Sequence, residues 1–298
     1  MLLFIVLYGD LPAQNTPGFF TPDPHYNNAR VNGTLLTEGV VFTGAMVALD
    51  FLWYRKFPHS RFHFFNDNAE WLQMDKVGHA TTVYNISALT SDVYTWSGVS
   101  PQRSAWLGGI TGLLFMTTIE IFDGFSNGWG FSSGDMLANT AGSALEVSQA
   151  LGWKEQRLQL RFSFHHTIYP EYRPELLGEN RAQQVLKDYN GQSYWLSANI
   201  YSFVGKGDNF PKWLNLDLGY GADGMTGGSN NPDNLKTPET YVRQRRFFLS
   251  PDVDLARIKY GTDWLMPIAR GLSIFKVPAP AFEFNATKKK AKLHFLYY

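Results

Sequence analysis

The spacing of apolar residues changes once along the chain, near residue 152, and this change constrains the fold more than any other feature. Before it, apolar segments long enough for helices are separated by glycine and proline. After it, apolar and polar residues alternate, as in residues 158–165, where Leu, Leu, Phe and Phe take turns with Gln, Arg, Ser and His. Period-two alternation is typical of a β-strand with one apolar and one polar face. The sequence therefore predicts an α+β fold, a helical bundle followed by an antiparallel β-rich region.

Four helices are expected before the change, over Leu35–Arg55, Asp75–Tyr94, Ser104–Phe122 and Ser133–Leu151. Thr34 or Thr37 is the expected N-cap of the first helix, and Gly152 is expected to end the fourth. Residues 1–34 are expected to form a signal-like segment and an extended leader. Within them, residues 1–14 have the apolar run of a secretory signal without its basic start, so a short buried strand or an N-terminal anchor is the alternative.

The helical half is expected to be membrane-associated. Only 17% of the residues are charged and 44% are hydrophobic, against about 25% charged in soluble domains. None of the four helices reaches the roughly 20 uncharged residues of a standard span. The third comes nearest, because Ser104–Ile119 has no charge and contains Gly108, Gly109 and Gly112, which allow close helix contacts. We expect a bundle partly sunk into a membrane, with a soluble four-helix domain as the alternative.

Residues 153–298 are expected to form the β-rich domain. Besides the strand at Leu158, strands are expected over Tyr194–Val204, Leu214–Tyr220, Arg246–Ile258, Leu272–Phe284 and Lys292–Tyr298. The aromatic residues that end the chain are similar to those of an outer-membrane strand. Pro251, Pro278 and Pro280 argue against a complete barrel, because proline cannot donate to a strand ladder. A curved sheet packed against the bundle, or a partial barrel, is therefore expected.

Six polar residues recur at helical spacing inside the apolar helical segments: Asp75, His79, Glu120, Asp123, Asp135 and Asn139. Spacings of three or four place each successive pair on one helix face. Carboxylates in apolar surroundings are costly unless they are paired, protonated or bound to a metal. If the three faces converge, the oxygen and imidazole donors suit a divalent metal ion. The alternatives are a catalytic centre and a structural polar network, in which Asp75 and Asp135 cap helices and His79 bonds a neighbouring carboxylate.

Composition and missing motifs exclude several functions. The 26 basic and 26 acidic residues balance, so no nucleic-acid partner is expected. Because the chain contains no cysteine, it is expected to have no disulfide framework, no zinc–thiolate site and no lipid anchor. It also contains no Gly-x-Ser-x-Gly elbow, no His-Glu-x-x-His helix and no phosphate-binding Walker loop.

Several motifs of the helical half resemble the YfiM/DUF2279 family of envelope proteins. They are Met74–His79, Ile119–Phe125, Trp129–Ser132 and the series Asp135, Asn139, Gly142. The resemblance covers roughly residues 35–150, and the β-rich extension looks like that of the longer members found in Bacteroidota. More distantly the chain is similar to VanZ-like membrane proteins, although these carry an arginine where this chain has Trp129–Ser132. The resemblance implies a bacterial cell-envelope location, at the outer membrane or its periplasmic face, and no known activity.

The sequence thus predicts a non-enzymatic, membrane-associated envelope protein. We expect an accessory subunit of an outer-membrane protein assembly or export complex, whose partners are membrane lipid and other subunits of that complex. The alternative is a metal-dependent hydrolase or transferase that acts on a lipid or glycan head group through His79, Glu120, Asp123 and Asp135. A third hypothesis is a small barrel that binds a hydrophobic ligand.

Overall fold

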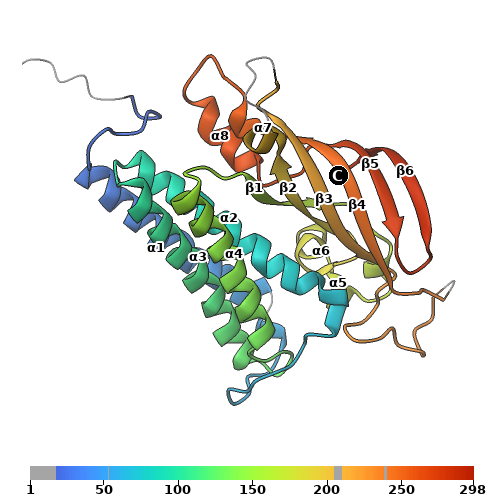
Figure 1. Cartoon of the computed structure of the whole chain (residues 1–298). Helices are drawn as coiled ribbons and strands as arrows, with labels where there is room; N and C mark the ends of the chain where they lie inside the picture. Colours follow the sequence, from blue (N-terminus) through green and yellow to red (C-terminus); the bar gives the residue numbers. More distant parts are fainter. Residues whose placement is uncertain (1–17, 53, 205–209, 238–239) are drawn as a thin grey trace, which may run out of the picture.

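The computed structural model describes residues 18–52, 54–204, 210–237 and 240–298. A bundle of four long helices lies beside a six-stranded sheet, and helix α2 lies between the other helices and the sheet (Figure 1). The expected α+β class is confirmed. The expected signal-like segment, residues 1–14, lies outside the described residues.

The long helices are α1 Asn28–Leu52, α2 Met74–Trp96, α3 Pro101–Gly124 and α4 Ser133–Gly152. The last three agree with the sequence prediction within three residues at each end. The first begins seven residues before the expected Leu35, because the Asn27 side chain caps it by accepting a hydrogen bond from the Arg30 N–H at 3.1 Å. The expected cap Thr34 lies inside the helix and donates to the Arg30 carbonyl. The extended leader is therefore shorter than predicted.

Small residues bring the helix backbones close together. A Cβ added at Gly108 of α3 would lie 2.3 Å from the Ser87 carbonyl oxygen of α2, and one at Gly142 of α4 would lie 2.2 Å from the Ala80 carbonyl oxygen. Such approach is usual where helices pack without a large apolar core between them. The small residues of α3 therefore face inward, while Trp106, Ile110 and other large apolar side chains face outward.

Short helical segments connect the larger elements. They are η1 Tyr54–Lys56, η2 Glu70–Gln73, η3 Tyr169–Glu171, α5 Pro174–Leu177, α6 Arg181–Lys187, α7 Ile200–Val204, η4 Leu255–Arg257 and α8 Leu265–Leu272. Three strands are shorter in the structure than the sequence predicted. Strand β2 ends where the Asn199 side chain caps α7, β4 ends where Asp254 caps η4, and the expected start Leu272 belongs to α8. Side-chain capping competes with the strand ladder at the first two positions.

The sheet consists of β1 Leu158–Phe164, β2 Gln192–Asn199, β3 Leu214–Asp223, β4 Gln244–Val253, β5 Ala279–Asn285 and β6 Lys290–Tyr297. Neighbours in sequence pair antiparallel in the order β1-β2-β3-β4-β5-β6. Among the described residues the sheet does not close into a barrel, so the hypothesis of a ligand-binding barrel is wrong. The predicted curved sheet packed against the bundle is confirmed, since Asn85 of α2 donates to the Leu160 carbonyl of β1.

The two faces of the sheet are inverted relative to those of a soluble protein. One apolar row crosses all six strands through the paired residues Leu160, Leu196, Leu218, Leu249, Phe282 and Leu293. Its members on β2 to β6 are exposed, Leu218 by 59% and Leu293 by 61%. On the opposite face, Arg161 and Asp217 are fully buried. Arg161 there donates to Asp252 at 2.7 Å. The sheet therefore buries its polar face and exposes much of its apolar face.

An apolar cluster joins the sheet to the bundle. Met74, at the start of α2, is fully buried against Tyr194 of β2, Ala222 of β3 and Met225. This contact holds the N-terminal end of α2 in a fixed position relative to the sheet.

Two helices, α1 and α3, are long and apolar enough to cross a membrane by length and composition alone. In the core helix of a soluble protein such a segment is mostly buried, whereas 11% of the α1 segment and 33% of the α3 segment are buried here. Both helices therefore leave most of their apolar surface uncovered by the protein.

Candidate functional site

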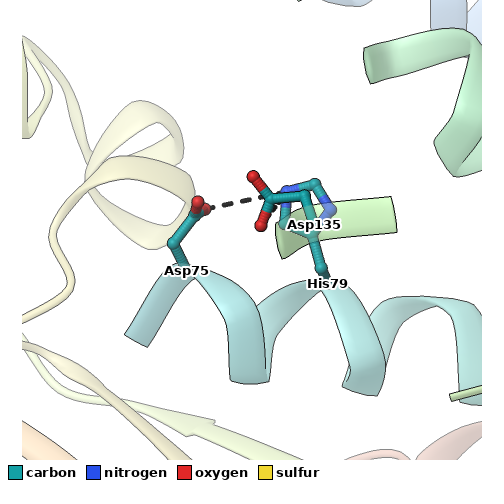
Figure 2. Close-up of side chains that lie close together, drawn as sticks. All are labelled: Asp75, His79 and Asp135. Carbon is teal, nitrogen blue, oxygen red and sulfur yellow. Dashed lines mark ion pairs between the residues drawn. The ribbon is translucent and has the colours of Figure 1, made fainter. Parts of the chain in front are cut away.

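Three helix ends meet at one end of the bundle and bring together five of the six expected residues. His79 lies on α2, and its Nδ1 is 3.1 Å from Asn139 Oδ1 and 3.5 Å from Glu120 Oε1. Its Nε2 is 3.7 Å from Asp75 Oδ1 and 3.9 Å from Asp135 Oδ1. Figure 2 shows the carboxylates of Asp75 on α2 and Asp135 on α4 beside the imidazole of His79. The expected convergence of the three faces is thus confirmed.

Asp123 lies at the edge of this cluster. Its Oδ1 accepts a hydrogen bond of 2.8 Å from the Tyr54 hydroxyl. Tyr54 also lines a largely apolar cavity of about 530 Å³, together with Met46, Phe51, Phe57, Phe122 and Phe125. Asp123 therefore connects the polar cluster to a cavity between the ends of α1 and α3.

Lys76 is the central cation of the cluster, and the sequence prediction did not include it. Its Nζ lies 2.7 Å from Asp67, 2.8 Å from Asp135 and 3.3 Å from Asp75. Only 14% of its side chain is exposed. Its place in the motif Asp75-Lys76-x-x-His79 was visible in the sequence, but the folded contacts with Asp67 and Asp135, 9 and 59 residues away, were not.

Asp75 and Asp135 were expected to cap helices, but neither residue is an N-cap. The Ser132 side chain caps α4 by accepting from the Asp135 N–H at 3.1 Å, which places Asp135 in the first turn. Ser132 also donates to Asp67 at 2.6 Å, and its own N–H donates to Glu120 at 3.0 Å. One serine therefore ties α3, α4 and the Asp67 loop into the cluster.

A left-handed turn precedes α2. Trp71, Leu72 and Gln73 have φ values of 47°, 52° and 62°, a region that costs non-glycine residues roughly 1–2 kcal/mol each. The sheet side holds the turn in place, since Arg245 donates to the Leu72 carbonyl at 3.0 Å and to the Gln73 side chain at 2.5 Å. Strain of this kind gathers at sites where position matters, and here it fixes the start of the helix that carries Asp75, Lys76 and His79.

Tyr189 links the cluster to the β-rich half. Its hydroxyl donates to Asp75 Oδ1 at 2.5 Å, and its ring lies 5.4 Å from that of Trp71. The residues expected to form the site did not include Tyr189. No local signal could reveal it, because the contact joins residues 114 positions apart.

The charges of the cluster depend on one another. Burial and the nearby Asp75 charge raise the pKa of Asp135 to about 7, although His79 and Lys76 lower it. Burial alone would lower the pKa of His79, but the carboxylates Asp75, Asp135 and Glu120 outweigh it and raise that pKa. Burial would likewise lower the pKa of Lys76, yet Asp75, Asp135 and Asp67 raise it. The cluster therefore favours the protonated forms of His79 and Lys76.

Two chemical roles fit this geometry. Asp75, His79 and Asp135 each offer a donor atom, and these atoms lie within 4.8 Å of one another, as a metal ion requires. Among the described residues, Glu120 Oε1 and Asn139 Nδ2 are buried without a hydrogen-bond partner. The other role is a structural network, in which Lys76 supplies the positive charge itself and holds three carboxylates at hydrogen-bond distance.

Residues 63–150 match the family model of DUF2279, described as a predicted periplasmic lipoprotein. The match confirms this part of the expected resemblance and supports the expected location in the cell envelope or at its periplasmic face. It contains α2, α3, α4 and all six expected site residues. The likeness to YfiM and to VanZ-like proteins, and the absence of a lipid anchor, stay predictions. No curated protein and no solved structure matches the chain.

Proposed function

We propose that the protein, whose residues 63–150 match the family model of a predicted periplasmic lipoprotein, is a non-enzymatic, lipid-embedded subunit of an outer-membrane protein assembly or export complex. The observation that carries this proposal is the inversion of both halves of the molecule. Large apolar side chains face outward on α3 and on one face of the sheet, while the buried side chains include the charged Glu120, Arg161 and Asp217 beside apolar residues such as Trp195. Large exposed apolar surfaces mark membrane or protein interaction sites.

The apolar surface on the sheet is continuous. Leu218 and Leu249 are directly paired, and Phe282 extends their row onto β5. At the site end of the bundle aromatic side chains are exposed as well, Phe64 by 73% and Phe125 by 44%. Aromatic rings favour the level of lipid head groups. Lipid therefore covers the sheet face in this proposal, and the aromatic end lies at the membrane surface.

A vesicle flotation assay tests the membrane contact. The variant Leu218→Asp/Leu249→Asp adds two charges to the apolar row and is expected to lower the bound fraction at least ~10-fold, because a charged side chain is costly in the hydrocarbon region. The control Leu186→Asp/Val242→Asp adds the same charge at two exposed apolar residues outside the row. Equal flotation of both variants would contradict the proposed lipid contact.

The role as a subunit is tested separately. A photo-crosslinking residue at Phe295, which is 88% exposed on the last strand of the sheet, is expected to give one discrete protein adduct in intact cells. The same residue at the exposed Leu186 is the control. If the residue at Phe295 gave only lipid adducts, the proposed membrane contact would stand, but a protein partner at this strand would be ruled out.

A second candidate function, a metal-dependent hydrolase or transferase acting on a lipid or glycan head group, is favoured by one observation. The ring of His79 is oriented through Nδ1 by Asn139, while Nε2 faces two carboxylates, and metal-binding histidines are commonly held in this way. The residues fit a divalent first-row metal, which would activate water there. In that case Asp75, His79 and Asp135 would hold the ion, and Glu120 would accept a proton from the ring.

Metal analysis of the purified chain separates the two candidates. A metal enzyme is expected to contain close to one equivalent of a first-row divalent metal, and His79→Ala is expected to lose it. Asn139→Asp is the matched variant, because it keeps an oxygen toward Nδ1. Absence of metal after purification without chelator, with unchanged stability on adding Zn²⁺ or Mn²⁺, would exclude this second function.

A further inference from the structure

A second cavity lies at the opposite end of the bundle from the acidic cluster. Its volume is about 630 Å³, and it lies between α2, α4, η4 and α8, beside strand β1. Its lining is rich in polar side chains, unlike that of the cavity at Tyr54. Neither the proposed membrane contact nor the cluster around His79 accounts for it.

Glu146 of α4 lines this cavity and is 1% exposed. Its Oε1 accepts a long hydrogen bond of 3.4 Å from Gln156, and among the described residues its Oε2 has no hydrogen-bond partner. Burial, together with the nearby charge of Asp92, raises the pKa of Glu146 to about 7, although the Ser91 hydroxyl lowers it. A buried carboxylate oxygen without a donor normally costs about 1–3 kcal/mol, or more when charged.

The arginines around the cavity do not supply that donor. Arg270 pairs with Asp92 on the cavity wall. Arg257 pairs with Glu155 at 3.1 Å and with Asp254 at 3.2 Å. Both arginines of the lining are therefore already engaged by carboxylates, and among the described residues no ion pair joins the third cation of the lining, Lys154, to Glu146. Glu146 remains as an acceptor. A ligand that completes this site must bring N–H donors and a positive charge.

We propose that this cavity binds a primary ammonium group, with Glu146 as the residue that accepts its N–H donors. A charged donor is favoured over a hydroxyl because charge-assisted hydrogen bonds are about twice as strong as neutral ones. The same ammonium chemistry occurs in the ethanolamine head group of a lipid and in an amino sugar. The inference is independent of the proposed function, since it depends on the cavity alone.

Calorimetric titration of the full-length protein in detergent tests the proposal with two matched pairs of probes. Phosphoethanolamine is compared with phosphocholine, whose quaternary ammonium has no N–H, and glucosamine is compared with N-acetylglucosamine. At least one primary amine is expected to bind at least ~10-fold more tightly than its partner compound. Binding of phosphoethanolamine alone assigns the site to a lipid head group, and binding of glucosamine alone assigns it to an amino sugar.

Two variants connect the binding to Glu146. Glu146→Gln keeps the shape of the side chain and is expected to weaken amine binding at least ~10-fold. Glu155→Gln, which changes a more exposed carboxylate of the same lining already paired with Arg257, is expected to bind as the wild type does. Equal binding within each probe pair, or unchanged binding by a folded Glu146→Gln protein, would overturn the proposal. The wild-type comparison decides the matter even if that variant does not fold.

Discussion

Lys76 determines the electrostatics of the acidic cluster more than any other residue. Its ammonium group lies between carboxylates from three segments of the chain, and it is mostly removed from water. Removing one partner of a buried ion pair leaves the others without compensation. The cluster therefore depends on this lysine whether or not a metal ion also binds at His79.

Lys76→Met is expected to lower the free energy of unfolding by about 3 kcal/mol, because it leaves Asp67 and Asp135 without their counter-charge. The double variant Lys76→Met/Asp135→Asn is expected to recover part of the loss. Denaturant titration measures both, with the exposed Lys292→Met as a control that changes stability by less than about 0.5 kcal/mol. A single variant as stable as this control would show that the pairs contribute little.

Glu146 is expected to make stability depend on pH. Its pKa is about 7 in the folded protein and 4.5 when unperturbed, so the folded state binds the proton more tightly. Its contribution to stability is fully present below pH 4.5 and is lost as the pH rises through about 7. Between pH 5 and pH 8 the free energy of unfolding of Glu146→Gln should therefore rise relative to that of the wild type by on the order of 2 kcal/mol. Parallel stability curves of the two proteins, measured by denaturant titration across this range, would contradict the shift.

At the scale of elements, the backbone contacts of α2 decide where the site residues lie. Gly108 and Gly112 let α3 approach α2, and Gly142 lets α4 approach it from another side. These contacts bring the end of α3 and the start of α4 to the level of His79. The left-handed turn at Leu72 fixes the start of α2 from the sheet side.

Gly108→Ala is expected to destabilise the protein by about 1–3 kcal/mol, because its Cβ would overlap the Ser87 carbonyl of the neighbouring helix. Gly44→Ala in α1 is the matched control, since a Cβ there meets nothing within 4 Å. The control should be stabilised by roughly 0.5–1 kcal/mol through helix propensity. Thermal unfolding in detergent compares them, and similar shifts in both would mean that the close approach is not needed.

At the scale of the whole molecule, two inverted halves are joined by a conventional apolar core. Met74, Tyr194, Ala222 and Met225 are buried together at the junction, while the exposed surfaces of both halves are rich in apolar side chains. This distribution keeps the polar cluster and the polar sheet face away from lipid. The contacts that reach the site from the β-rich half, Tyr189 with Asp75 and Arg245 with the turn at Leu72, exist only while the two halves are docked.

Met74→Ala is expected to cost roughly 2–5 kcal/mol, because it leaves a cavity at a fully buried junction. Unfolding of the two halves should then separate, with Trp71 near the junction changing its fluorescence first. Leu137→Ala, a truncation at a residue 72% exposed on α4, should change stability by less than about 0.5 kcal/mol. If both truncations have the same effect, the junction does not hold the halves together.

The sequence by itself determined the elements and part of the site. Local periodicity sets helix and strand, so α2, α3, α4 and β1 were predicted closely, and spacing placed Asp75 and His79 on one face. Errors came where side chains cap, at Asn27 and Asn199, because a cap depends on one hydrogen bond and not on a pattern. Only the tertiary structure decided that Lys76 neutralises the cluster, that Tyr189 reaches Asp75, and that the sheet buries its polar face. Alternation shows that a strand has two different faces, but which face is covered depends on contacts between residues far apart in the chain.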